Sequence, residues 1–244
     1  MNHREATELV DLAAEKGLFL MEAMWTRFLP ATIEALQLVS EGAIGQLKSA
    51  QSTIGGPMDT AKALAVGFKE MAGPTLEEQQ AEKLLGDGIF LGAGVYALTI
   101  PNFFFRQEYN HDDSSLTMTA TGTLNQAGAD VGGHYIIDYP GAGRALAHIT
   151  REYPLPNETW LYGTAGQIRL NSTWGPSAFE LNGELHEAPF MAPAPAAKGK
   201  WSGENDATTW RSGLAHEIVE CMECIGTLLS PDSQLQSPLL QLCA

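Results

Sequence analysis

The sequence predicts an α/β (α+β) fold in which an open, mostly antiparallel β-sheet is flanked by helices. Three observations support this prediction. The chain begins with a helical pattern that is followed by a short apolar segment. A nearly continuous apolar run over residues 89–105 is too hydrophobic for a surface element and indicates a buried helix. Five short segments of alternating polarity lie between residues 116 and 185, separated by Gly, Asn and Pro turns, which is typical of antiparallel strands.

The first predicted element is an amphipathic helix over residues 5–16. Its apolar face consists of Ala6, Leu9, Val10, Ala13 and Ala14. Gly17 is placed to end this helix in the left-handed conformation. The segment LFLMEAM, residues 18–24, is predicted to form a short, largely buried strand. Helix, turn and strand form the second half of a βαβ unit whose first half is absent, so we expect this end to be frayed, repacked or covered by a second subunit.

The next elements lead into the strand-rich region. Pro30 opens a helix with an apolar face formed by Ile33, Leu36 and Val39. A strand over residues 46–54 follows it. Residues 55–88 are less regular and contain a capping box at 75–78. The buried helix after them is expected to stop near Pro101 or Asn102, because proline interrupts helical hydrogen bonding.

The carboxyl-terminal part combines a loop with a final helix. Residues 188–206 are rich in Pro, Ala and Gly and are predicted to be a loop or linker. An apolar helical face runs from Leu214 to Leu228. The three cysteines, Cys221, Cys224 and Cys243, are clustered and odd in number, which argues against a disulfide framework. Cys221 and Cys224 have redox or half-zinc-site spacing, but they lie in the helical pattern, where packing as small hydrophobes is favoured.

Charge and composition exclude several function classes. The formal net charge of -15 argues against nucleic acid and anionic membranes as partners, because both are bound by clustered Lys and Arg. No apolar run of about 18 residues is present, and acidic residues stand where a signal peptide needs an apolar stretch. We therefore expect a soluble, cytoplasmic protein. The histidines show no metal-ligand spacing and no nucleophile elbow occurs, so neither a metal site nor hydrolase chemistry is predicted.

Several segments resemble consecutive motifs of one oxidoreductase family. They are MEAMWTRFLPAT, GAIGQLKSAQSTIG, GDGIFLGAGVYALTIPNFFF, WLYGTAGQIRL and LAHEIVECMECI, in the family's order over most of the chain. The family is Gfo/Idh/MocA, which contains glucose-fructose oxidoreductase and inositol dehydrogenase. Within it, the sequence is similar to the branch of dihydrodiol dehydrogenases and NADP-dependent xylose dehydrogenases.

This resemblance implies two domains and a reaction class. Residues 1–28 would be the last helix and strand of a truncated Rossmann domain, and residues 29–244 the substrate and oligomerisation domain with the open sheet. The family uses NAD(P) as cofactor and transfers hydride between the nicotinamide and a sugar, polyol or dihydrodiol. The resemblance also implies a homodimer that forms through the β-sheet.

Five residues are candidate site residues by the same resemblance. Trp25 and Arg27 would line the nicotinamide and substrate pocket; the alternatives are interdomain packing and a structural ion pair. Tyr96 holds the position of the catalytic acid–base residue; the alternative is a buried tyrosine bonded to the backbone. Lys48 and Trp174 would lie near the substrate; the alternatives are surface charge and sheet packing.

Two features of the family pattern are absent. Gly92 stands one helical turn before Tyr96, where family members carry an acidic residue. No GxGxxG motif follows a strand, and the E-K-P segment with the family's catalytic lysine should precede residues 2–13, whereas the chain begins at Met1. We therefore expect that this chain alone does not bind NAD(P) and is inactive. The alternative is a non-catalytic remnant that acts as a dimerisation or ligand-binding module.

Overall fold

The computed structural model describes most of the chain in six ranges. These are residues 3–56, 88–109, 115–124, 130–190, 216–219 and 221–222. The chain divides into two compact units, one formed by Leu29–Pro189 and the other by Met1–Phe28 with Phe190–Ala244. The predicted domain division, residues 1–28 against 29–244, stays a prediction. The predicted capping box at 75–78 lies outside the described residues.

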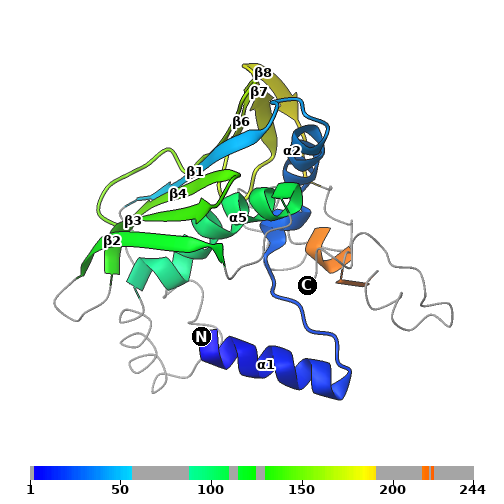
Figure 1. The fold of residues 1–244 in the computed structure, drawn as a ribbon, viewed down its shortest axis with the longest axis vertical. Coiled ribbons are helices and arrows are strands. Elements are labelled where there is room, and N and C mark those ends of the chain that lie inside the picture. Colours follow the sequence, from blue (N-terminus) through cyan, green and yellow to red (C-terminus); the bar gives the residue numbers. More distant parts are fainter. Residues whose placement is uncertain are drawn as a thin grey trace, which may run out of the picture. The chain divides into compact units, whose positions relative to one another are not determined.

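The larger unit is built on an eight-stranded mixed sheet (Figure 1). Its strand order is β2-β3-β4-β1-β5-β6-β7-β8. The strands are β1 Leu47–Gly55, β2 Thr117–Leu124, β3 Asp130–Tyr139, β4 Gly143–Thr150, β5 Thr159–Gly163, β6 Gln167–Leu170, β7 Ala178–Leu181 and β8 Glu184–Glu187. Only the pair β1–β4 is parallel in this sheet, and the other neighbours pair antiparallel. This confirms the predicted α/β class with an open, mostly antiparallel sheet flanked by helices.

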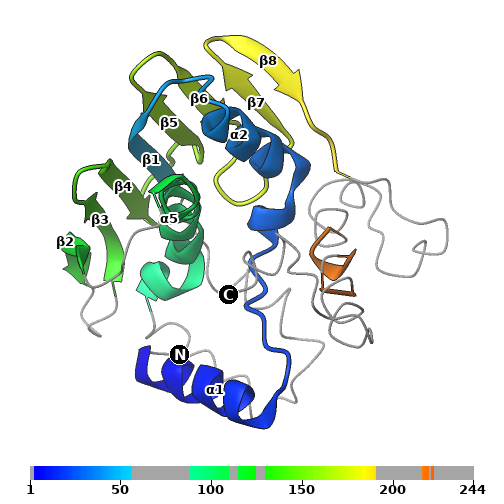
Figure 2. The same ribbon diagram turned by 45° about the vertical axis from the view of Figure 1, so that its right-hand side comes forward.

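Two helices cover one face of this sheet (Figure 2). Helix α5 (Val95–Tyr109) packs on β1 and β4, and α2 (Pro30–Ser40) packs on β6 and β7. Ala147, Ile149 and Leu161 point into the core between the sheet and these helices. Because side chains alternate along a strand, the residues next to them in the sequence point to the opposite side of the sheet. We call that side the open face. It carries His134, Leu146, His148, Trp160 and Tyr162 among others.

Helix α2 begins and ends as predicted. Pro30 occupies a first helical position, and Gly42 follows the helix with a φ of 80°, donating its N–H to the carbonyl of Val39 at 3.0 Å. Of the three residues predicted for its apolar face, Val39 is buried and Leu36 packs against the core, whereas Ile33 is exposed. The buried residues of the helix are Ala31, Thr32, Ala35 and Val39.

Helix α5 continues through Pro101 to Tyr109, so the predicted end near Pro101 or Asn102 was wrong. Proline removes one helical hydrogen bond and costs about 3 kcal/mol in a helix interior. Ile100, Phe104 and Phe105 are fully buried against the sheet. Burying each such side chain contributes roughly 1.5–3 kcal/mol, which together outweighs the cost of the proline.

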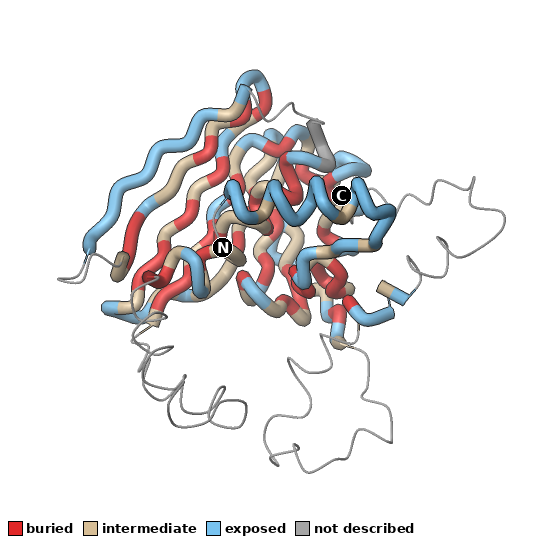
Figure 3. The backbone as a smooth tube through the Cα atoms, turned by 90° about the horizontal axis from the view of Figure 1, so that it is seen from below, coloured by how far each residue is buried: buried red, intermediate tan, exposed pale blue. Residues whose placement is uncertain are grey.

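The smaller unit opens with helix α1 (His3–Lys16). Gly17 has a φ of 62° and ends the helix as predicted, with the N–H of Leu18 donating to the carbonyl of Ala13 at 2.9 Å. No residue of α1 is buried, and Figure 3 shows most of its length as exposed. The predicted strand over residues 18–24 was wrong, because this segment has no regular secondary structure. A strand requires a hydrogen-bonded neighbour, and none of the described strands pairs with these residues.

The described part of the carboxyl-terminal segment is short. Residues 216–219 and 221–222 are helical, as predicted, but Ile218 and Met222 are exposed instead of forming a buried apolar face. Cys221 is partly buried, and Cys224 and Cys243 lie outside the described residues. Among the helices described here, none is long and apolar enough to cross a bilayer.

Candidate functional site

Tyr96 lies in the first turn of α5, directly after the π-helical turn η2 (Phe90–Gly94). Single π turns within helices occur frequently at functional sites. The Tyr96 ring is partly buried and packs against a hydrophobic cluster that includes Ile54 of β1 and Ile149 of β4. Both residues lie near the carboxyl ends of the two parallel strands. Tyr96 is therefore at the end of the sheet where open α/β folds bind their ligands.

Asp130 fixes the start of this helical segment. Its Oδ2 accepts a hydrogen bond from the backbone N–H of Phe90 at 2.9 Å. Gly88 has a φ of 76°, and a Cβ there would overlap the Asp130 carboxylate. The carboxylate satisfies one of the free N–H groups at the helix start and complements the positive end of the helix dipole. Asp130 is not predictable as a site residue from local sequence patterns, because the bond joins residues 40 positions apart.

Tyr135 of β3 is a second phenol in the same cluster as Tyr96. Its ring lies 4.6 Å from the ring of Phe90, measured between centroids. Burial raises the pKa of Tyr135, and the charge of Asp130 raises it further. The Tyr135 hydroxyl therefore stays protonated at neutral pH. Sequence reasoning placed Tyr135 only in a strand, since its proximity to η2 depends on tertiary packing.

Trp174 is presented by a loop that long-range hydrogen bonds anchor to β1. The Thr173 N–H donates to the carbonyl of Asn157 at 2.9 Å, and the Thr173 Oγ1 donates to the carbonyl of Thr53 at 3.0 Å. Thr173 itself is fully buried, whereas Trp174 is 40% exposed. Thr53 is near the carboxyl end of β1, so Trp174 and Tyr96 lie toward the same end of this strand.

Lys48 lies at the opposite end of β1. Its Nζ donates to the carbonyl of Ala142 at 3.4 Å, in the turn between β3 and β4. From Lys48 to Ile54 the strand rises roughly 20 Å, at about 3.3 Å per residue. The structure therefore does not bring Lys48 next to Tyr96 or Trp174. The role of Lys48 in substrate binding stays a prediction.

Trp25 and Arg27 belong to the smaller unit, in the 3₁₀ helix η1 (Trp25–Phe28). Trp25 is 7% exposed and contacts the ring of Phe190 edge to face, with centroids 6.3 Å apart. The Arg27 N–H donates to the carbonyl of Met24 at 3.1 Å, and its side chain is partly buried. The Trp25 side chain is thus held by a contact within its own unit, and the Arg27 backbone is bonded to Met24, the residue before η1. Their predicted part in cofactor and substrate binding stays a prediction.

A model of the GFO/IDH/MocA C-terminal domain matches residues 32–169, which is more than half of the chain. The chain belongs to the Gfo/Idh/MocA family. This confirms the resemblance seen in the sequence motifs. The matched region contains most of α2, all of β1, α5 and β2 to β5, and most of β6, and therefore the residues that surround Tyr96.

Two curated relatives of this chain carry the same enzyme name. A trans-1,2-dihydrobenzene-1,2-diol dehydrogenase from Xenopus laevis is 29% identical over 226 residues, covering 92% of this chain and 59% of the relative. The enzyme of the same name from Danio rerio is 27% identical, covering 96% of this chain and 62% of the relative. The chain thus spans about three fifths of the length of these curated relatives.

Solved Gfo/Idh/MocA-like structures share the fold. A 3-ketoreductase from Actinomadura kijaniata, in complex with NADP and TDP-benzene, superposes with a TM-score of 0.61 at 17% identity, covering 94% of this chain and 61% of that one. An aldose–aldose oxidoreductase from Caulobacter crescentus, complexed with glycerol, gives 0.53 at 17% identity, covering 88% of this chain and 64% of that one. At these identities the likeness shows the fold alone.

The described residues do not fit the pyrophosphate of a dinucleotide. Such a site needs free backbone N–H groups at a helix start that follows a glycine-rich turn. The glycine Gly88 does precede a helix, but the Asp130 carboxylate already accepts from the Phe90 N–H there and would repel an anion. Helix α2 begins with Pro30, which has no N–H to offer. Neither of these two helix starts therefore provides this part of the Gfo/Idh/MocA cofactor site.

Gly92, which replaces the acidic residue of the Gfo/Idh/MocA motif, is exposed, and an added Cβ would meet no atom within 4 Å. The Gly92→Ala variant should raise the free energy of unfolding by about 0.5–1 kcal/mol, because alanine loses less backbone entropy than glycine. Gly94→Ala is the matched control, since its Cβ would lie 2.8 Å from Ile149 Cδ1. Urea unfolding followed by circular dichroism measures both variants. If Gly94→Ala stabilised the protein as much as Gly92→Ala, or more, the conclusion that position 92 has room for a side chain and position 94 does not would be contradicted.

Proposed function

We propose that this chain supplies the substrate-binding part of an NAD(P)-dependent oxidoreductase that acts on a sugar, polyol or dihydrodiol. The observation that carries the proposal is the position of Tyr96, on α5 at the carboxyl ends of β1 and β4, within the region that matches the family. Relatives named as trans-1,2-dihydrobenzene-1,2-diol dehydrogenases match 92–96% of the chain and support a dihydrodiol as the first substrate class to test.

In this proposal Tyr96 exchanges a proton with the hydroxyl of the substrate carbon that is oxidised. General acid–base catalysis of this kind contributes roughly 10²–10⁴-fold to a rate. Trp174 offers a half-exposed indole at the same end of β1, where it can lie against the apolar side of a ring. Trp25 and Arg27 are proposed to contact the cofactor or the substrate, as the family resemblance implies. When bound, the nicotinamide supplies the hydride acceptor.

We further propose that these 244 residues do not hold the cofactor by themselves. Two observations support this. The sequence contains no GxGxxG motif after a strand, and the Phe90 N–H is already bonded to Asp130. The chain would then turn over substrate only together with a dinucleotide-binding domain.

The test is a chimera in which the amino-terminal dinucleotide-binding domain of a full-length family member precedes this chain. Turnover is followed by NADPH absorbance with trans-1,2-dihydrobenzene-1,2-diol and with D-xylose. We expect the chimera to reduce NADP⁺ with at least one of these substrates. A folded chimera that binds NADPH and turns over neither class would overturn the proposed activity.

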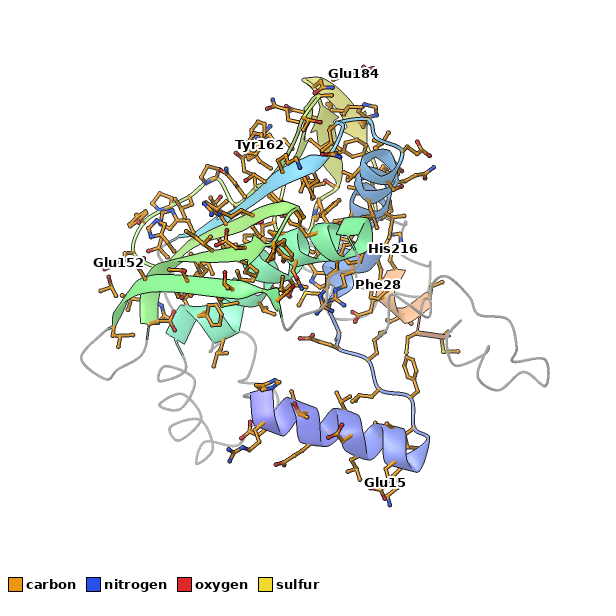
Figure 4. The ribbon with its side chains drawn as sticks, viewed as in Figure 1. Glu15, Phe28, Glu152, Tyr162, Glu184 and His216 are labelled. Carbon is orange, nitrogen blue, oxygen red and sulfur yellow. The ribbon has the colours of Figure 1, made fainter. Side chains whose placement is uncertain are left out.

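A second candidate is a dimerisation or ligand-binding module without catalysis, and the open face favours it. Trp160 and Tyr162 stack there with centroids 5.7 Å apart and an angle of 3° between their planes. The Arg169 guanidinium bridges Glu158 and Glu180 at 2.7 and 2.8 Å beside them. Figure 4 shows Tyr162 on the side of the sheet away from α5. Such an ordered aromatic and charged surface suits packing against a second sheet.

We therefore propose that two copies pair through the part of the open face around Trp160 and Tyr162, apart from His134 and His148, whether or not the chain is catalytic. Sedimentation equilibrium of the wild-type chain should give the mass of a dimer. The Trp160→Glu variant should shift the dissociation constant upward by at least tenfold, because it places a charge in an apolar contact. A monomer at all protein concentrations would contradict the pairing.

A further inference from the structure

Two histidines face each other on the open face of the sheet, far from the contacts of α2. His134 of β3 and His148 of β4 are directly opposite in the strand register. Their imidazole rings lie 4.1 Å apart between centroids, with 22° between the ring planes. The neighbours of His148 along β4, Ala147 and Ile149, belong to the core, so His148 points away from α5.

A pocket of about 290 Å³ surrounds this histidine pair. Oxygen-bearing side chains from three segments line it together with the imidazoles. They are Thr121 and Thr123 of β2, Thr150 of β4, and Glu152 and Tyr153 of the following loop. Figure 4 shows Glu152 near this end of the sheet. None of the described residues that line the pocket is Lys or Arg, so no fixed positive charge opposes a cation.

The chemistry of the pair suits a metal. Neutral imidazole nitrogen is a preferred donor for Zn²⁺, Cu²⁺ and Ni²⁺. The Tyr153 hydroxyl lies 3.0 Å from His148 Nε2 and orients that ring, as outer partners of metal-binding histidines do.

We propose that His134 and His148 bind one divalent transition-metal ion, such as Zn²⁺, in this pocket on the open face. One donor nitrogen of each ring would lie about 2.0–2.1 Å from the ion. Because imidazole lone pairs lie in the ring plane, both rings must rotate out of the stacked arrangement so that these nitrogens converge on the ion. The described residues contain no group of three His, Cys, Asp or Glu ligands, so water fills the remaining positions. An ion with water ligands can then exchange them for an oxygen of a small molecule in the pocket. The proposal does not depend on the oxidoreductase function.

The experiment is a Zn²⁺ titration of the wild-type chain followed by ¹H–¹⁵N correlation of the histidine side chains. The signals of His134 and His148 should shift together and saturate at one equivalent of Zn²⁺. His134→Gln and His148→Gln should each weaken binding at least tenfold, measured by competition with a chelating dye. His186→Gln is the control, because His186 stacks on Phe179 outside this pocket and should leave the affinity unchanged.

Three results would overturn the metal site. In the first, Zn²⁺ shifts neither His134 nor His148 in the wild-type spectrum. In the second, only one of the two signals moves. In the third, a folded His134→Gln or His148→Gln variant keeps the wild-type affinity. Tyr153→Phe provides a second check, since it keeps both imidazoles and should reduce the affinity by less than either histidine variant.

Discussion

Replacing Tyr96 by phenylalanine is expected to lower kcat of the chimeric enzyme by roughly 10²–10⁴-fold, the usual contribution of a general acid–base group. The change removes only the hydroxyl, and the ring keeps its packing against the cluster around Ile54 and Ile149. In the proposed mechanism the hydroxyl acts in the transition state, so KM should change far less than kcat. Steady-state kinetics with NADP⁺ and the better substrate measures both constants.

Tyr135→Phe is the matched control for this prediction. It deletes the same atom from a phenol in the same cluster, but Tyr135 is on the sheet and not on α5. We expect the control to keep kcat within about tenfold of the parent. If both variants lost the same factor in kcat, the two hydroxyls would act by stabilising the packing of the cluster, and the loss could not be assigned to acid–base catalysis by Tyr96. An unchanged kcat in Tyr96→Phe would remove Tyr96 from catalysis.

Phe105→Ala is expected to lower the free energy of unfolding by about 3–5 kcal/mol, the usual cost of truncating a buried aromatic side chain. The Phe105 ring is fully buried and stacks on Tyr139 of β3, with centroids 4.4 Å apart and 11° between the planes. The Tyr139 hydroxyl also donates to Asn102 Oδ1 at 2.6 Å, so one tyrosine holds α5 by two contacts. Losing the ring leaves a cavity between helix and sheet.

Urea unfolding measures this effect, and Leu91→Ala is its control. Leu91 belongs to the same helical segment but is mostly exposed, so its truncation should change stability by no more than about 0.5 kcal/mol. If Phe105→Ala were as mild as the control, α5 would not be held to the sheet in the way described. The described position of Tyr96 at the end of the sheet would then be wrong as well, because it depends on the packing of α5.

The strands and most helices follow from patterns within short stretches of sequence. In β4, for example, core residues alternate with residues of the open face, and this period of two is visible in RALAHIT. The ends of α2 follow from Pro30 and Gly42, which act on their own backbone. Features of this local kind were predicted correctly from the sequence.

The errors arose where tertiary contacts decide the outcome. Pro101 is a local signal to stop a helix, but the burial of Phe104 and Phe105 overrides it. Residues 18–24 have the composition of a buried strand, but a strand also needs a partner for its hydrogen bonds. A local sequence pattern shows which secondary structure a segment prefers, but it does not show whether a neighbouring strand is available to pair with it.

The residues of the candidate site divide in the same way, between those predicted from local sequence patterns and those that depend on tertiary contacts. The motif places Tyr96 on the predicted buried helix, and the structure confirms that Tyr96 is helical, in the first turn of α5. Asp130 and Thr173 were missed, because their bonds to Phe90 and Thr53 join residues 40 and 120 positions apart. The opposed pair His134 and His148 was missed for the same reason, since only the pairing of β3 with β4 brings the two rings together.

We propose that this chain carries the substrate side of an oxidoreductase without a dinucleotide site of its own. Fluorescence titration of NADPH with the 244-residue chain, beside the chimera, tests this most directly. We predict saturable binding by the chimera and no saturable change with the chain alone. Saturable micromolar binding of NADPH by the chain alone would contradict the account.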